Sequence, residues 1–278
     1  MLLICCLFLN IMVRCTFSQG INYLPPIHHG AYYPDEYDHD QVTNDLMSWH
    51  PYDVGHPWEL SGLLEGDIME SPEKGRNVIR SKEASWPGGV IPYVMQPGMT
   101  QDERQAVDRG MELVCQGSCI TFRPYQEGDK DYIVILYNMT GCWSYVGRQG
   151  GGQVVSLHRG GCYHPGTVAH EFLHATGFYH QQSAADRDGY VYIDFDNIEE
   201  GHEHNFDKKS PAEVTDFGVG YDYSSVMHYS RTAFSKNGED TIIPFEPGAQ
   251  IGQREKVSKK DFLKLNRKYK CKKRPAAR

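Results

Sequence analysis

The stretch that begins at His170 and ends at His180 reads HEFLHATGFYH and sets three histidines at fixed intervals. Residues four apart share one face of a helix, so His170 and His174 can present two imidazoles to one metal ion. Gly177 adopts positive φ without a steric penalty, which ends the helix and lets His180 complete a three-nitrogen site. Glu171 lies beside a ligand, where it can take a proton from a water in the open position.

A second motif, SVMHY, places Met227 after the third histidine, as in the methionine turn of metzincins. Met227 is assigned no chemistry and forms an apolar floor beneath the three histidines. An isolated H-E-x-x-H is weak evidence, because unrelated helices carry it by chance or as a structural histidine cluster. The glycine, the third histidine and the methionine turn together favour a zinc endopeptidase.

These motifs resemble the astacin family of zinc metalloendopeptidases, and the resemblance extends from Leu64 to Cys271. Further matching stretches are WPGGVIPY at 86–93, GCWSYVGR at 141–148, DRD at 186–188, YDYSS at 221–225 and IGQR at 251–254. The resemblance implies an α+β fold, a two-lobed metzincin domain with a mixed sheet and the active-site helix in its N-terminal lobe. The catalytic domain is expected to span 77–271.

The resemblance also implies the roles of the site residues. One Zn²⁺ per chain is bound by the three histidines and, at rest, by Tyr229, which swings away to bind the oxyanion. Glu171 is the general base, so the expected catalytic residues are Glu171 and Tyr229. Protein or peptide substrates and a monomeric enzyme are expected, without a nucleic-acid partner.

The first part of the chain has the composition of a targeting segment followed by an acidic leader. Residues 1–18 form a short apolar run that predicts a secretory signal peptide and an extracellular protein without a membrane span. Residues 19–76 hold 11 acidic and two basic residues, whereas 77–278 hold 25 of each. This asymmetry predicts a removable pro-segment over 19–76, with disorder over roughly 19–55 because apolar residues are scarce.

The leader contains no cysteine between 19 and 76, so a thiolate cannot block the metal. The stretch LEGDI at 64–68 instead resembles the aspartate switch of the family, in which Asp67 replaces the catalytic water. Gly66 allows the close approach of the backbone. An activating protease is expected to cut after Arg76 and free Asn77.

One position departs from the family pattern. The residue after the third zinc histidine is usually a glutamate that meets the new amino terminus, but here it is Gln181. A neutral amide loses the charge-assisted part of that contact, so weaker locking of the amino terminus is expected. The change does not touch the zinc chemistry.

Five cysteines follow the leader, which predicts disulfides in a secreted chain and leaves several pairings open. The resemblance implies Cys142–Cys162 and Cys119–Cys271. Cys115 is then the odd cysteine, a buried free thiol or alternatively an intermolecular link. Asn138 begins an N-glycosylation sequon, Asn-Met-Thr, at the end of an expected strand.

Caps and hydrophobic patterns predict several elements. The expected elements are helices opening at Thr100 with Glu103 and at Ser258 with Asp261, a zinc helix capped by Thr167, a buried strand over 131–137 and an edge strand over 153–158 beside the cleft. Residues 254–278 carry 12 basic side chains, and 272–278 form a basic tail. These charges can bind an acidic polysaccharide, but a solvated helix face is the preferred interpretation.

Three other functions compete with the enzyme. A non-catalytic binding protein on a protease scaffold would lack a zinc ligand or the glutamate, and both are present here. Another metzincin branch is disfavoured by Tyr229 and by the leader without cysteine, although Gln181 removes one family marker. A structural zinc protein would need a fourth protein ligand at a suitable spacing, and the sequence offers none.

Overall fold

The computed structural model describes residues 23–49, 56, 58–70 and 84–272. The predicted signal peptide, the Arg76–Asn77 cleavage site and most of the basic tail lie outside these residues. The helices are α1 (His39–Ser48), α2 (Gln101–Cys115), α3 (Pro165–Thr176) and α4 (Lys259–Lys268). The strands are β1 (Val90–Met95), β2 (Thr121–Pro124), β3 (Tyr132–Leu136), β4 (Cys142–Ser144), β5 (Gly152–Leu157), β6 (Val191–Ile193) and β7 (Ile242–Pro244).

The first five strands form one mixed sheet in the order β2-β1-β3-β5-β4. The pairs β1–β2, β1–β3 and β3–β5 are parallel, and β4 runs antiparallel to β5. The predicted edge position of 153–158 is therefore wrong, because β5 lies between β3 and β4 and the three-residue β4 forms the edge. The predicted α+β class with a mixed sheet is confirmed.

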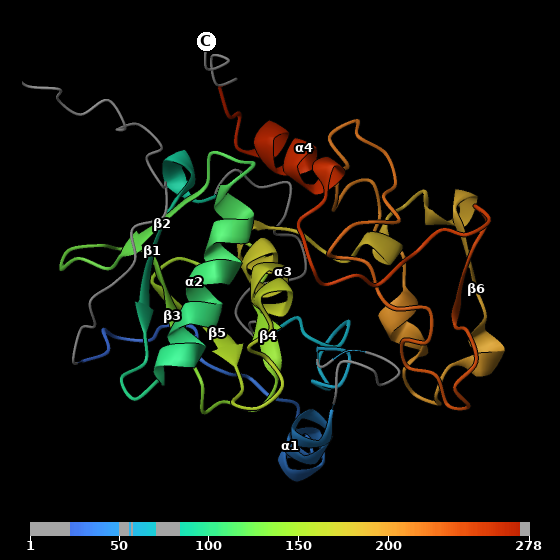
Figure 1. Ribbon diagram of the computed structural model, residues 1–278, viewed down its shortest axis with the longest axis horizontal. Coiled ribbons are helices and arrows are strands. Elements are labelled where there is room, and N and C mark those ends of the chain that lie inside the picture. The colour runs from blue at the N-terminus through green and yellow to red at the C-terminus, as the bar shows by residue number, and fades with distance from the viewer. Residues whose placement is uncertain (1–22, 50–55, 57, 71–83, 273–278) are drawn as a thin grey trace, which may run out of the picture.

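Helices α2 and α3 pack side by side against one face of the sheet (Figure 1). This face carries Ile133 and Ile135 of β3, which share a hydrophobic core with Met111 of α2 and Phe172 of α3. The Thr100–Glu103 capping box at the start of α2 is present, as predicted. The two hydrogen bonds of this box satisfy two of the unpaired backbone N–H groups at the first turn and fix where the helix begins.

The leader covers the opposite face of the sheet. Side chains alternate along a strand, so Val134 points away from the helices and joins a second core with Leu24 and Tyr33 of the leader. Tyr132 Oη and Tyr145 Oη donate hydrogen bonds to leader carbonyl oxygens, those of Pro26 at 2.5 Å and Gly30 at 2.8 Å. The expected disorder of 19–55 is therefore wrong for the described residues 23–49, which also contain α1.

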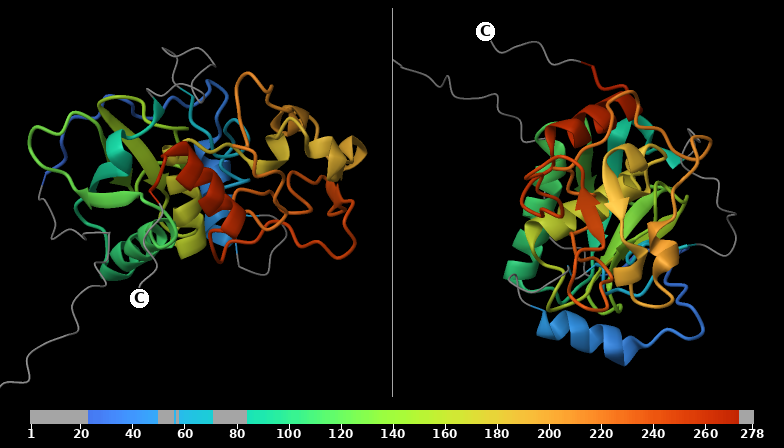
Figure 2. Two further views of the ribbon diagram at one scale, coloured as in Figure 1. Left: turned by 90° about the horizontal axis from the view of Figure 1, so that it is seen from above. Right: turned by 90° about the vertical axis from the view of Figure 1, so that its right-hand side faces the viewer.

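The second lobe follows α3 and contains little regular structure (Figure 2). Its 3₁₀ helices are η3 (Gln181–Ser183), η4 (Arg187–Gly189), η5 (Phe195–Asn197) and η6 (Glu203–Phe206), and η2 (Pro87–Gly89) precedes β1 in the first lobe. Antiparallel strands β6 and β7 border a core that includes Phe206 and Tyr229. Helix α4 opens with the predicted Ser258–Asp261 capping box.

Two disulfides join distant parts of the chain. Cys142–Cys162 links β4 to the loop before α3, and Cys119–Cys271 links the segment after α2 to the end of α4. Both are the pairs implied by the family resemblance. Cys115 is disulfide-bonded as well, so the expected free thiol is wrong.

Candidate metal centre and active site

Helix α3 presents two of the predicted ligands on one face. Its N-cap is His164, whose Nδ1 accepts a hydrogen bond from the Gly166 N–H, so the predicted cap at Thr167 is wrong. Gly177 ends the helix with φ of 103° and donates its N–H to the His174 carbonyl. The left-handed turn at this glycine redirects the chain toward His180, as the sequence predicts.

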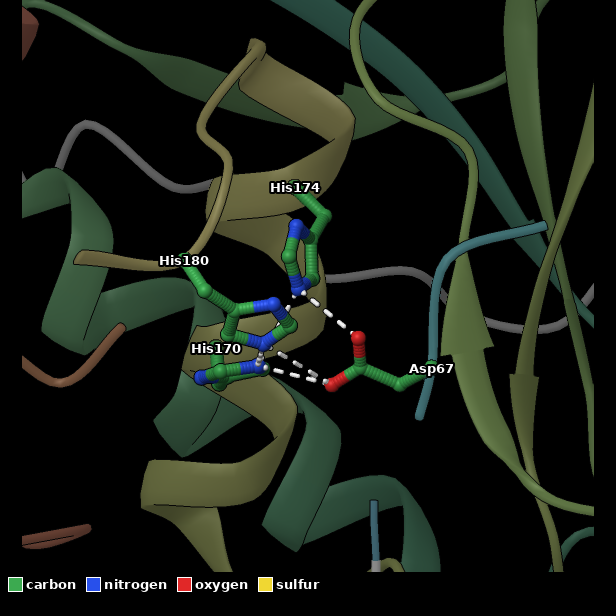
Figure 3. A group of neighbouring side chains, drawn as sticks. All are labelled: Asp67, His170, His174 and His180. Carbon is green, nitrogen blue, oxygen red and sulfur yellow. Dashed lines mark hydrogen bonds and ion pairs between the residues drawn. The ribbon is translucent and has the colours of Figure 1, made fainter. Parts of the chain in front are cut away.

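The three predicted histidines and Asp67 of the leader meet at one buried point (Figure 3). His170 Nε2 lies 3.1 Å from His174 Nε2 and 3.2 Å from His180 Nε2. Asp67 Oδ2 lies 2.9 Å from His170 Nε2, and Asp67 Oδ1 lies 3.2 Å from His174 Nε2. One ion at this point can therefore contact all four side chains.

The second ring nitrogen of each histidine fixes the tautomer. Each Nδ1 faces an oxygen that only accepts hydrogen bonds, so each Nδ1 carries the proton and each Nε2 presents a lone pair. The acceptors are Val226 O for His170 at 2.8 Å, Phe178 O for His174 at 2.7 Å and Glu65 Oε2 for His180 at 2.9 Å. The rings are therefore oriented before any ion binds.

Three lone pairs and a carboxylate that converge in a buried space require a positive charge. Burial opposes a charged imidazole at His180, but Asp67 and Glu65 outweigh it and raise the pKa of His180 to about 9. A divalent cation satisfies the same demand without a proton. Three imidazoles with one carboxylate oxygen form a donor set that suits zinc, so these residues fit the predicted cofactor.

The methionine turn contacts His170 through the Val226 carbonyl and is held from two sides. Met227 is buried, and its carbonyl accepts a hydrogen bond from the Gln181 N–H at 2.8 Å. The Val226 N–H donates a hydrogen bond to Asp261 Oδ2 at 3.1 Å, while the Val226 carbonyl accepts one from His170 Nδ1. The α4 cap residue Asp261 thus supports the ligand His170 through the backbone of a single residue, Val226, a role that its capping motif did not reveal.

Glu171 is a buried carboxylate without a hydrogen-bond partner among the described residues. Burial and the neighbouring charge of Asp67 raise the pKa of Glu171 well above its usual range. An unpaired buried carboxylate is costly for stability, and such groups concentrate where they accept or release protons. The geometry therefore suits the general-base role expected for this residue.

Tyr229 lies beside the third histidine, with ring centroids 4.7 Å apart. Its hydroxyl donates to the Glu65 carbonyl oxygen at 2.7 Å, so the leader engages it here. Burial and the charges of Glu65 and Asp67 hold the pKa of Tyr229 well above its usual range. The phenol is therefore a neutral hydrogen-bond donor next to the metal centre.

The leader contributes residues to the site that sequence reasoning missed. Trp58 stacks on His170 with centroids 5.1 Å apart, and the Arg254 guanidinium lies 3.7 Å from the centroid of the Trp58 ring. Glu59 accepts a hydrogen bond from the Ser230 N–H at 3.0 Å. The stretch LEGDI contains Glu65, but the motif treats it as a spacer and gives no sign of its contact with His180.

Two further predicted positions, Gln181 and Asn138, are not part of the metal centre. The Gln181 side-chain oxygen accepts a hydrogen bond from Lys264 Nζ. Lys264 is buried, so its ammonium group, and not the new amino terminus, contacts the Gln181 side chain here. Asn138 follows β3 and is exposed, and the Thr140 hydroxyl of its sequon contacts His39 Nδ1 at 2.8 Å.

Comparisons with known proteins agree with this geometry. The family model described as Astacin (Peptidase family M12A) matches residues 78–270. Zinc metalloproteinase nas-14 of Caenorhabditis elegans is 36% identical over 94% of this chain and 59% of its own length. Low choriolytic enzyme of Oryzias latipes is 39% identical over 76% of this chain and 79% of its own length.

A solved structure supports the fold independently. High choriolytic enzyme 1, a hatching-enzyme zinc protease from Oryzias latipes, is 35% identical and superposes with a TM-score of 0.62. The match covers 74% of this chain and all of the solved chain. The chain belongs to the astacin family, peptidase family M12A. It spans 54% to 65% of the length of three nematode relatives, nas-14, nas-13 and nas-6.

Proposed function

We propose that this chain is the zymogen of a secreted zinc metalloendopeptidase that cleaves internal bonds of proteins or peptides. The observation that carries the proposal is the meeting of three oriented, buried imidazoles beside the unpaired carboxylate of Glu171. Family membership supports the same chemistry. Residues 1–18 direct secretion, 19–76 form the pro-segment, 77–271 the catalytic domain and 272–278 the basic tail.

His170, His174 and His180 hold the zinc ion. When bound there, zinc supplies a Lewis acid that polarises the scissile carbonyl and acidifies the attacking water. Glu171 takes the proton of this water and delivers it to the leaving amine. Tyr229, released from the leader, donates its phenolic hydrogen to the developing oxyanion and also serves as a resting zinc ligand.

Latency rests on the leader. Asp67 occupies the position that the catalytic water needs, and Trp58 covers the outer face of His170. The carboxylate is fully buried, so water does not compete with it for the ion. An activating protease cuts after Arg76, frees Asn77 and allows the leader to depart.

The remaining assignments concern the outside of the molecule. Asn138 carries an N-glycan, consistent with its exposed side chain. The active enzyme is a monomer that leaves the cell. Among the described residues, none of the helices is both long and apolar enough to cross a membrane.

A quenched-fluorescence peptide library tests the proposal. The zinc-loaded full chain is assayed before and after cleavage at Arg76, with and without a chelator, beside the Glu171→Ala variant. We expect cleavage only after activation, and its loss with the chelator or with Glu171→Ala. A folded, zinc-loaded and correctly cleaved protein that hydrolyses no peptide would refute the enzyme and favour a binding protein.

A further inference from the structure

The leader pairs with a part of strand β5 that strand β4 leaves uncovered. The last residue of β4, Ser144, lies opposite Val155, so residues 152–154 of β5 extend beyond the end of β4. The leader fills this edge, where His29 pairs with Gln153 in the manner of a parallel strand. A sheet edge offers backbone N–H and C=O groups to any extended chain that lies along it.

The catalytic part of the chain holds the main chain of the leader at this edge. The His29 N–H donates to the Gly152 carbonyl at 2.9 Å, and the His29 carbonyl accepts from the Val154 N–H at 3.0 Å. The hydroxyls of Tyr132 and Tyr145 donate to two further leader carbonyls at 2.5 and 2.8 Å. Main-chain groups are present in every sequence, so these four contacts do not require the sequence of the leader.

One leader side chain, that of Tyr33, has a specific place beside this edge. Its hydroxyl donates to the Thr140 carbonyl at 2.7 Å and accepts from Trp143 Nε1 at 3.2 Å. Its ring meets the Trp143 ring edge-on, with centroids 6.2 Å apart, and packs on the apolar face that includes Val134. Residues 23–33 contain no Asp, Glu, Lys or Arg, so the segment that docks here is extended, uncharged and aromatic.

This surface adjoins the metal cleft. The Ser144 N–H donates to the Asp67 carbonyl at 3.1 Å, and the Ser144 carbonyl accepts from the Met69 N–H at 3.0 Å. The next residue, Tyr145, reaches the Gly30 carbonyl on the other part of the leader. Release of the leader therefore opens the cleft and this surface together. An extended chain that covers the apolar face again and pairs with its polar groups gains affinity there.

We propose that this surface, formed by residues 152–154, Tyr132, Tyr145 and the Tyr33 pocket at Trp143, binds a second segment of a protein substrate. The occupant is an extended, uncharged segment with a tyrosine three residues after its last main-chain contact, as Tyr33 follows Gly30. Another segment of the same substrate occupies the metal cleft. The surface adds affinity for long substrates and none for peptides too short to reach it. The inference rests on the proposed function.

The test uses the full chain, cleaved at Arg76 and separated from its leader, and one quenched-fluorescence peptide in three forms. The peptide is used alone, joined by glycine–serine linkers of several lengths at either end to the segment LPPIHHGAYY, or joined to the same segment with its last tyrosine changed to alanine. We expect the tyrosine form to have a kcat/KM about tenfold above that of the peptide alone, because the tether raises the effective concentration of the cleavage site. The alanine form should lose most of this gain.

A double variant, Tyr132→Phe with Tyr145→Phe, removes two hydroxyl donors and keeps both rings. We expect it to lower the gain from the tethered segment about fivefold, as for the loss of one net hydrogen bond, without changing the hydrolysis of the short peptide. A merely structural role of these tyrosines would lower both rates together. The matched control is Tyr192→Phe, an exposed tyrosine of β6 in the second lobe, which should change neither rate.

Equal cleavage of the three peptides at every linker length would overturn the inference, and so would a gain that survives unchanged in the double variant. If that variant does not fold, Tyr145→Phe alone replaces it. Fluorescence polarisation of labelled LPPIHHGAYY on the cleaved, leader-free Glu171→Ala protein measures binding without turnover, and the absence of saturable binding would also overturn the inference. Wild type that cleaves none of the peptides would refute the proposed function, while polarisation still decides whether the surface binds the segment.

Discussion

The carboxylate of Glu171 combines complete burial with the absence of a partner among the described residues. Its raised pKa means that folding around the charged form is unfavourable. We predict that Glu171→Gln, which keeps the shape but cannot take a proton, lowers the rate of the activated enzyme about 10²- to 10⁴-fold. Thermal unfolding of the intact zymogen should show equal or higher stability, because the neutral amide avoids the burial of a charge.

The matched control for this substitution is Glu112→Gln on the exposed side of α2, which should change neither quantity. An activated Glu171→Gln enzyme with wild-type rates would exclude the general-base role. A large loss of zymogen stability would show that the carboxylate has a structural partner instead.

Lys268 near the end of α4 offers a prediction on pH. Burial lowers its pKa from 10.5 to about 8, so the unfolded chain binds more protons than the folded chain between these values. Wild-type stability should therefore rise with pH across this window. The full destabilisation caused by burying the charged ammonium applies only below about pH 8, where Lys268 is protonated in the folded protein. We predict that Lys268→Met stabilises the protein at pH 7 and that its advantage shrinks at pH 9.5. Chemical denaturation of both proteins at pH 7 and at pH 9.5 measures the difference in their free energies of unfolding. An equal difference at the two pH values would contradict the prediction.

At the scale of single residues, the sequence reveals ligands but not their supports. The spacing of His170, His174 and His180 follows from helix geometry, and the structure brings these side chains together. The contacts of Trp58, Glu65 and Asp261 with the site depend on approaches between distant segments. Local patterns carry no information on such contacts, so these residues could not be found from the sequence.

The turn at 63–66 is the element that inserts the leader into the site. The N–H groups of Leu63 and Gly66 donate to each other's carbonyls, and Gly66 has φ of 85°. A Cβ at Gly66 would lie 2.9 Å from the Trp58 carbonyl oxygen and 3.3 Å from the Phe234 ring. We predict that Gly66→Ala weakens docking of the leader and raises the activity of the uncleaved zymogen about tenfold, a change of about 1.4 kcal/mol.

The control for this element is Gly128→Ala. Gly128 has φ of 98°, and a Cβ added there would have no atom within 4 Å. It carries the backbone strain without a contact at the site, so the uncleaved zymogen should stay as latent as wild type. Peptide hydrolysis by both uncleaved variants measures the difference. Equal latency in Gly66→Ala and wild type would contradict the role given to the turn.

At the scale of elements, the sequence predicted helices better than strands. The capping boxes at Thr100 and Ser258 mark where α2 and α4 begin. The edge of the sheet was misplaced because β4 has only three residues and no alternating pattern. The cap of α3 was misplaced because Pro165 occupies its first turn, where a proline is favoured, and moves the start to His164.

At the scale of the whole molecule, the leader forms one layer of the first lobe. Its residues Leu24 and Tyr33 cover the sheet face that carries Val134 and Val154. Removal of the leader exposes this apolar face and the metal cleft together. We therefore predict that cleavage at Arg76, followed by release of the leader, lowers the thermal midpoint of the zinc-loaded protein by several degrees.

Calorimetry before and after separation of the leader measures this effect, and nicked protein from which the leader has not been separated is the control. The nicked control should unfold near the midpoint of the intact chain, because the same faces remain covered. An unchanged or higher midpoint after separation would show that the leader adds no stability.

The architecture of the catalytic part could be predicted, while the order of the leader could not. The α+β fold with a mixed sheet is what the family resemblance implies, and the motifs around His170 and Met227 carry that resemblance. The leader is poor in aliphatic residues, which suggested disorder, yet its tyrosines pack and donate hydrogen bonds to backbone carbonyls. Tyr33 donates to Thr140 O at 2.7 Å and Tyr37 to Ser61 O at 2.6 Å. Aromatic residues with a polar end can thus order a segment that composition alone assigns to the disordered class.

The most direct test of a latent metal centre is X-ray absorption at the zinc edge of the full chain, before and after cleavage at Arg76. The account predicts one zinc per chain, bound by three imidazoles and one carboxylate oxygen at about 2.0–2.2 Å, without sulfur. The carboxylate contribution should disappear both in Asp67→Ala and after release of the leader, while the three imidazoles remain. Fewer than three imidazoles, a sulfur ligand, or an identical spectrum in Asp67→Ala would contradict the account.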